Sequence, residues 1–149
     1  MTLKQKIFNH YLQVLNEKIA SLQQVLNDLK ESGANETKST AGDKHETALA
    51  MLQIEQANTR AQLKEVVDQK NVFERIDPTL SPVGVVMGSL IKTNRGYLFF
   101  SIGAGKAVVD ENPVIALSPN SPLGKKLMGL KAGDTAEINN VQYIIESIS

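Results

Sequence analysis

The sequence predicts an α+β protein in which an N-terminal antiparallel α-helical coiled-coil hairpin, residues 1–77, precedes a small antiparallel-sheet domain, residues 78–149. Three observations support this prediction. Apolar residues recur at alternating steps of four and three through most of the first half. Short apolar runs separated by turn residues fill the second half, and two prolines divide the halves in "IDPTLSP", residues 76–82.

The first half opens with a long amphipathic segment that we expect to be a helix over residues 3–31. Its apolar residues follow the spacing that keeps one apolar seam along a coiled coil. The seam positions are Phe8, Leu12, Leu15, Ile19, Leu22, Leu26 and Leu29.

A second segment, residues 45–75, repeats this alternation more weakly, because polar residues interrupt its seam. The seam positions here are Leu49, Leu52, Gln56, Thr59, Leu63, Val66, Lys70 and Phe73. An antiparallel match of the two seams pairs Leu29 with Leu49 and Leu15 with Leu63, so the hairpin should turn near residue 39.

The tip of this hairpin, "SGANETKSTAGDKHE" at residues 32–46, has no large apolar residue, so we expect it to face solvent or a partner. It contains two carboxylates, Asp43 and Glu46, three positions apart. One interpretation is a capping box, with Asp43 as the N-cap of the second helix and Glu46 at its third position. The other is that both side chains hold Mg²⁺, which takes oxygen ligands and often only one or two carboxylates from a protein. The spacing alone favours the cap.

The second half contains short strand-like runs with one helix between them. The runs "VGVVMGSLIK" and "GYLFFSIG" flank the turn "TNRG", and "AVV" and "PVIALS" follow. The last two runs, "TAEI" and "VQYIIESI", flank "NN", a common two-residue hairpin connection. In "SPLGKKLMGLKAGD" we expect a helix with Ser121 as its N-cap and Pro122 as its first residue, and with Leu123, Leu127 and Leu130 on one face.

Composition limits the classes of function. The 149 residues contain 16 Lys plus Arg and 16 Asp plus Glu, so total charge does not direct the chain to bare nucleic acid or to an anionic membrane. The absence of cysteine excludes disulfides, thiolate metal sites and thiol nucleophiles. The polar N-terminus does not resemble a signal peptide, and no apolar run reaches the length of a membrane span. We therefore expect a cytoplasmic protein with no membrane partner.

The order of these motifs resembles one family. A long antiparallel hairpin with Gly-Asp-x-x-Glu at its tip, then a sheet domain with "NSPLGKKLMGLKAGD" and the ending "VQYIIESI", is similar to the Gre transcript-cleavage factors of bacterial RNA polymerase. The resemblance spans nearly the whole chain and is strongest at "GSLI" and "SPNSPLGKKLMGLKAGDTAEI". It implies an FKBP-like fold for residues 78–149.

The resemblance also implies a GreA/GreB-like transcription elongation factor. In that family the hairpin enters the secondary channel of RNA polymerase, and two tip acids, matching Asp43 and Glu46 here, help hold the second catalytic Mg²⁺ for hydrolysis of backtracked RNA. The free chain is not expected to bind Mg²⁺ tightly or to have an activity of its own. The loop of Asn120, Ser121 and Pro122 matches the family's docking loop. Contact with RNA is expected only at the nascent 3′ end within the polymerase complex, with no direct binding to DNA.

Two departures from the family support alternatives. The family's tip usually continues as Asn-x-Glu-Tyr after the second acid, whereas "TALAML" follows here. The hairpin half also lacks a pronounced basic patch for extruded RNA. One alternative is therefore a regulator or inhibitor that binds in the channel without stimulating cleavage. A second is a coiled-coil adaptor that only recognises proteins. Prolyl isomerase activity is a poor third interpretation, because a fold does not fix a function.

Overall fold

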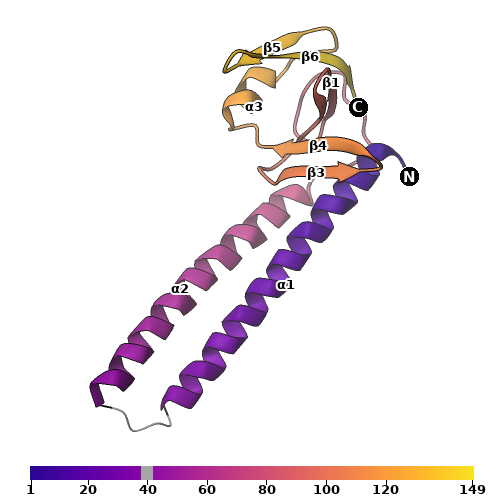
Figure 1. The fold of residues 1–149 in the computed structure, drawn as a ribbon. Helices are drawn as coiled ribbons and strands as arrows, with labels where there is room; N and C mark the ends of the chain where they lie inside the picture. The colour runs from indigo at the N-terminus through magenta and orange to yellow at the C-terminus, as the bar shows by residue number, and fades with distance from the viewer. Residues whose placement is uncertain (38–41) are drawn as a thin grey trace. The chain divides into compact units, whose positions relative to one another are not determined.

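The computed structural model of the chain describes the backbone of residues 1–37 and 42–149, and the side chains of residues 1–34 and 46–149 (Figure 1). Two long helices, α1 (Leu3–Thr37) and α2 (Gly42–Phe73), precede a six-stranded mixed sheet and one short helix, α3 (Pro122–Leu127). The predicted fold class is confirmed. In the described part of the chain, no helix combines the length and the apolar character needed to span a membrane.

The predicted seams are confirmed by burial. Every predicted seam position of the two helices is buried or half-buried, whereas most residues between them, such as Asn16, Glu17 and Lys18, are exposed. The polar seam residue Thr59 is among the buried ones, at 8% exposure, and its hydroxyl donates to the Glu55 carbonyl at 2.8 Å. A polar seam residue can thus be buried within a helix pair, because the preceding turn of its own helix satisfies the hydroxyl.

The helix ends at the tip differ from the prediction. We expected helices over residues 3–31 and 45–75, but α1 continues to Thr37 and α2 begins at Gly42. Gly33, read from the sequence as part of a loop, is helical. A glycine within a helix costs only about 1 kcal/mol relative to alanine, so it does not by itself end the helix.

Gln56 shows how Gly33 fits the hairpin. The Gln56 amide donates to the Leu29 carbonyl at 3.3 Å, and a Cβ on Gly33 would lie 3.6 Å from the same amide nitrogen. Glycine therefore leaves room for a polar side chain of the opposite helix. The predicted pairing of Leu15 with Leu63 stays a prediction.

The chain divides into two compact units. One is Gln13–Lys70, the greater part of the hairpin, and the other joins Met1–Leu12 to Asn71–Ser149. The first residues of α1 and the last residues of α2 thus belong with the sheet. The predicted domain boundary after residue 77 stays a prediction.

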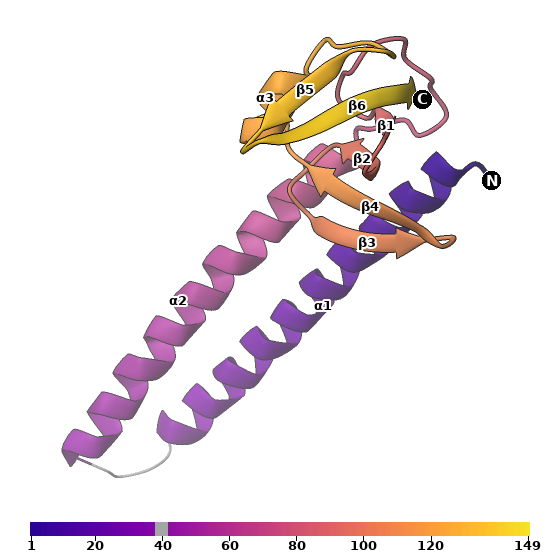
Figure 2. The ribbon, with the colours of Figure 1, turned by 45° about the horizontal axis from the view of Figure 1, so that its top comes forward.

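The sheet has the strand order β3-β4-β2-β1-β6-β5, and Figure 2 shows β3 beside β4 and β5 beside β6. Its neighbouring strands are antiparallel except β2 and β4, which run parallel because the β2–β4 connection contains β3. The strands are β1 (Leu90–Thr93), β2 (Gly96–Phe100), β3 (Gly105–Val109), β4 (Asn112–Leu117), β5 (Thr135–Ile138) and β6 (Val141–Ile148).

Two hairpin turns of this sheet have positive φ at both central residues. Asn139 and Asn140 have φ of 52° and 64°, as expected for the predicted two-residue connection between β5 and β6. The turn between β3 and β4 uses Asp110 and Glu111, with φ of 48° and 66°. Glutamate is unusual in this conformation, which explains why the sequence did not predict the second turn.

Strand β2 is buried on both faces. Leu98 and Phe100 join the core beneath α3, together with Val85, Ile91, Leu117, Leu127, Ala136 and Ile145. Phe99 points to the other face, where it contacts the helix ends. Because successive side chains of a strand alternate between faces, three consecutive buried residues require cover on both sides.

The cover on the second face is an aromatic cluster of Phe8, Tyr11, Phe73 and Phe99. Phe8 stacks on Phe73 with ring centroids 4.8 Å apart, and the Phe73 ring meets Phe99 edge-on at 5.9 Å. The Tyr11 ring lies 6.5 Å from Phe99, and its hydroxyl donates to the Gly105 carbonyl at 2.8 Å. The cluster joins both helix ends to β2 and β3.

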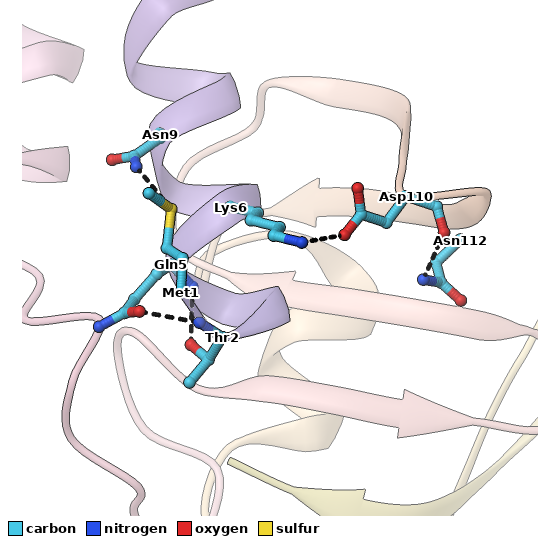
Figure 3. Close-up of polar contacts among 7 residues, drawn as sticks. All are labelled: Met1, Thr2, Gln5, Lys6, Asn9, Asp110 and Asn112. Atoms are coloured by element: carbon cyan, nitrogen blue, oxygen red, sulfur yellow. Dashed lines mark hydrogen bonds and ion pairs between the residues drawn. The ribbon is translucent and has the colours of Figure 1, made fainter.

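An ion pair adds a second contact to the first turns of α1. The Lys6 ammonium lies 2.5 Å from the Asp110 carboxylate in the turn between β3 and β4 (Figure 3). Both side chains are about half exposed, so the pair contributes little to stability and mainly orients its partners.

The Tyr11 hydroxyl gives a direct test of this packing. Tyr11→Phe keeps the ring and removes the hydrogen bond to Gly105, so we expect it to lower the free energy of unfolding by about 1 kcal/mol in urea denaturation. Tyr143→Phe is the matched control, because the Tyr143 hydroxyl makes no hydrogen bond to the described residues. Equal effects of the two substitutions would contradict the role given to Tyr11.

Candidate functional site

The two tip acids lie at the start of α2. The capping box assumed that Asp43 lies just before the first helical residue. The helix instead begins at Gly42, so the backbone of Asp43 is already helical. Residues three apart on a helix lie on the same side of it, which places Asp43 and Glu46 on one side of the first turns. Glu46 is exposed, and the side chain of Asp43 lies outside the described residues.

These donors fit a hard divalent cation only in part. Carboxylate oxygens are the ligands that Mg²⁺ prefers, but two carboxylates leave most of its six positions to water or to a partner. Among the residues whose side chains are described, no group of three His, Cys, Asp or Glu could hold a metal ion. A site built on Asp43 and Glu46 would therefore need ligands from a second molecule.

The predicted docking loop lies where β4 leads into α3. Ser121 is the N-cap of α3, its hydroxyl accepts from the Gly124 amide at 3.0 Å, and Pro122 occupies the first helical position, as predicted. The same hydroxyl donates to the Ser118 carbonyl at 2.7 Å. The backbone N–H of Asn120 donates to the Ser118 hydroxyl at 3.1 Å. This network fixes the loop and leaves Asn120 and Pro122 exposed.

Gly124 lets the loop close on itself. A Cβ at this position would lie 2.1 Å from the Ser118 carbonyl oxygen and 2.8 Å from the Ser121 hydroxyl. Glycine is therefore required for the close approach of the helix start to the preceding turn.

Two lysines on α3 complete this surface. Lys125 and Lys126 are both exposed, and the Lys126 ammonium donates to the Glu137 carbonyl of β5 at 2.5 Å. Lys126 is thus tied to the sheet, while Lys125 remains available to an acidic group of a partner.

Sequence analysis did not identify a third surface, formed by the segment that follows α2. Leu80 and Val83 are exposed there, and Lys4 at the start of α1 is buried beside Leu80. The signal that could have identified it is the run of apolar residues in "LSPVGVVMG", of which several stay exposed.

Solved structures similar to this chain include the following two. A crystal structure described as GreA factor homolog 1 (Gfh1) of Thermus thermophilus is 17% identical, with 95% of this chain and 92% of that chain covered and a TM-score of 0.33. A structure described as the transcription factor Gfh1 is 16% identical, with 95% and 90% covered and a TM-score of 0.34. No protein-family model matches the sequence, and no curated protein matches it.

The close approach at Gly124 can be tested by adding one methyl group. Gly124→Ala should lower the free energy of unfolding by about 2 to 3 kcal/mol, because the new methyl group would overlap a backbone carbonyl. Gly103→Ala is the control, since a Cβ there meets nothing within 4 Å. A Gly124→Ala protein as stable as the Gly103→Ala protein in urea denaturation would disprove the described packing.

Proposed function

We propose that this chain is a transcription elongation factor that binds bacterial RNA polymerase, inserts its hairpin tip into the secondary channel and stimulates cleavage of backtracked RNA. The observation that carries the proposal is the pair of acids, Asp43 and Glu46, in the first turns of α2, where the hairpin reverses. The resemblance of the surrounding motifs to the Gre factors supports the choice of partner.

The hairpin has dimensions suited to entering a channel. Residues 13–37 of α1 extend about 37 Å at 1.5 Å per residue, and two packed helices are roughly 20 Å across. The seam residues face the opposite helix, so the outer surfaces remain largely polar. Such a rod could carry two carboxylates to a recessed site without unfolding.

The chemistry proposed for the tip is limited to holding a cation. Mg²⁺ bound there would polarise a phosphate oxygen and activate a water for attack on the RNA backbone. Asp43 and Glu46 supply two negative oxygen ligands, and RNA polymerase supplies the rest of the site together with the RNA. We propose no independent enzymatic activity for the chain, contact with RNA only at the 3′ end inside the complex, and no direct contact with DNA.

The docking loop is the second part of the proposal. Asn120 and Pro122 are exposed on a loop whose backbone is fixed by Ser118 and Ser121. A preorganised loop loses little conformational entropy when it binds, which favours affinity. We assign this loop to the contact with the polymerase surface.

One feature favours a second candidate function. After Glu46 the helix continues with Thr47, Ala48, Leu49 and Ala50, where the Gre factors usually carry Asn-x-Glu-Tyr, so Leu49 and Ala50 stand in place of an acidic and an aromatic residue. A tip without those contacts could fill the channel and block it. A channel-binding regulator that does not stimulate cleavage is therefore the alternative.

Substitutions of the two tip acids distinguish a capping role from metal binding. If the acids hold Mg²⁺, Asp43→Asn and Glu46→Gln should each reduce cleavage of backtracked RNA to the level of polymerase alone, because neutral amides are poor Mg²⁺ ligands. Raising the Mg²⁺ concentration should partly restore activity. If Asp43 only caps, Asp43→Asn should be silent, since Asn caps as well as Asp. The measurement is the length of labelled RNA in a stalled, backtracked complex.

The control for this experiment is Glu65→Gln, which neutralises an exposed acid farther along α2. It should leave cleavage unchanged. A wild-type protein that binds polymerase but releases no RNA fragment at any Mg²⁺ concentration would refute the cleavage proposal and favour the regulator.

The docking loop can be tested separately. Asn120→Glu combined with Pro122→Glu should weaken binding to RNA polymerase, because charges replace the two exposed side chains of the loop. Thermal unfolding should change little, by less than about 0.5 kcal/mol, since neither side chain is buried. Glu146→Arg, at an exposed position of β6, is the control, and unchanged affinity of the double variant would move the docking site elsewhere.

A further inference from the structure

The segment between α2 and β1 exposes more apolar surface than its neighbours. Leu80 is 62% exposed, Val83 79%, Val86 47% and Met87 43%. Single exposed apolar residues are ordinary, but four large ones within one short segment are typical of a surface that binds another molecule.

This segment borders a surface pocket of about 530 Å³. Leu80, Val86 and Met87 contribute apolar wall, and Lys4 and Arg75 contribute positive charge. The pocket lies entirely within the unit of Met1–Leu12 and Asn71–Ser149. Its volume is in the range that accommodates one or two large side chains or a small ligand.

Lys4 is the most unusual residue of the pocket, because only 5% of it is exposed. Its ammonium has three N–H donors, and among the described residues the single hydrogen-bond acceptor is the Leu80 carbonyl, at 2.7 Å. The nearby carboxylate of Asp77 accepts from the Thr79 amide and hydroxyl, at 2.9 and 2.5 Å. The ammonium therefore keeps donors for an additional acceptor.

Electrostatics indicate the sign of that acceptor. Burial lowers the pKa of Lys4, and the charge of Asp77 raises this pKa by a smaller amount. Asp77 therefore offsets only part of the cost of burying the protonated ammonium. Arg75 is exposed and its guanidinium has no partner among the described residues. An anionic group in the pocket would offset the desolvation of Lys4 and could pair with Arg75.

We propose that this pocket, which we call the Lys4 pocket, binds a short protein segment that carries a carboxylate side chain next to a large apolar side chain. The carboxylate would pair with Lys4 and Arg75, and the apolar side chain would cover Leu80, Val86 and Met87. The proposal is independent of RNA polymerase and of the tip acids.

The exposed rim favours a protein segment over other anions. Leu80 and Val83 extend the apolar surface beyond what a small carboxylate could cover. Nucleic acid would need several cations along its backbone, whereas the pocket offers two cations and the carboxylate of Asp77. Methionine and arginine are also enriched where proteins bind each other, and Met87 can adapt its shape to a partner.

The test is selection of short random peptides displayed on phage, with the full chain as target and the Lys4→Met, Arg75→Gln double variant as counter-target. Selected peptides should be enriched in Asp or Glu beside Leu, Ile, Met or Phe. For a synthetic selected peptide, replacing the acid by its amide should weaken binding about tenfold or more in calorimetry, as expected for a lost hydrogen bond between charged groups.

Variants of the chain separate binding from folding. Arg75→Gln alone should weaken binding of the same peptide while circular dichroism and the unfolding midpoint stay unchanged, because Arg75 is exposed. Lys92→Gln, at an exposed position of β1, is the matched control and should have no effect.

Several results would overturn the proposal. They include selected peptides without acidic residues, equal affinity for the wild-type and Arg75→Gln chains, and no peptide that survives the counter-selection. Saturable binding of octanoate that displaces the selected peptide at lower concentration would also overturn it, in favour of a small-molecule site.

Discussion

The packing of Phe73 against Phe99 is the contact on which the unit containing the sheet depends. Phe73 ends α2 and Phe99 lies in the middle of β2, and both are fully buried. Since β2 is also buried on its other face beneath α3, the sheet needs the helix ends as its second cover. Phe8 and Tyr11 complete that cover from the first turns of α1. The helices therefore take part in the fold of the sheet unit and are more than an appended coiled coil.

The hairpin itself is held by a different balance of forces. Most of its seam side chains are only half-buried, because two helices cannot enclose their contact surface completely. Gln56 and Thr59 add hydrogen bonds to backbone carbonyls, so their polar groups remain satisfied within the seam. A seam of this kind keeps the helices paired without a large apolar core.

The sequence predicts a feature correctly where a residue pattern is compatible with only one local structure. The seam from Phe8 to Leu29, the cap at Ser121 and the turn at Asn139 and Asn140 were predicted because spacing or backbone geometry dictates them. The helix ends at the tip were misplaced, since Gly33 is tolerated where Gln56 takes its space. The parallel pairing of β2 with β4 and the burial of Lys4 depend on contacts between distant residues, which no local pattern reveals.

The central claim is that the tip of the hairpin reaches the active centre of RNA polymerase. The most direct measurement places a photo-crosslinking amino acid at Ala50, an exposed position near the start of α2, and maps its crosslinks in a complex with purified bacterial RNA polymerase. The account predicts crosslinks to residues lining the secondary channel next to the catalytic Mg²⁺. Crosslinks confined to the outer surface of the polymerase, or no complex at all, would contradict it.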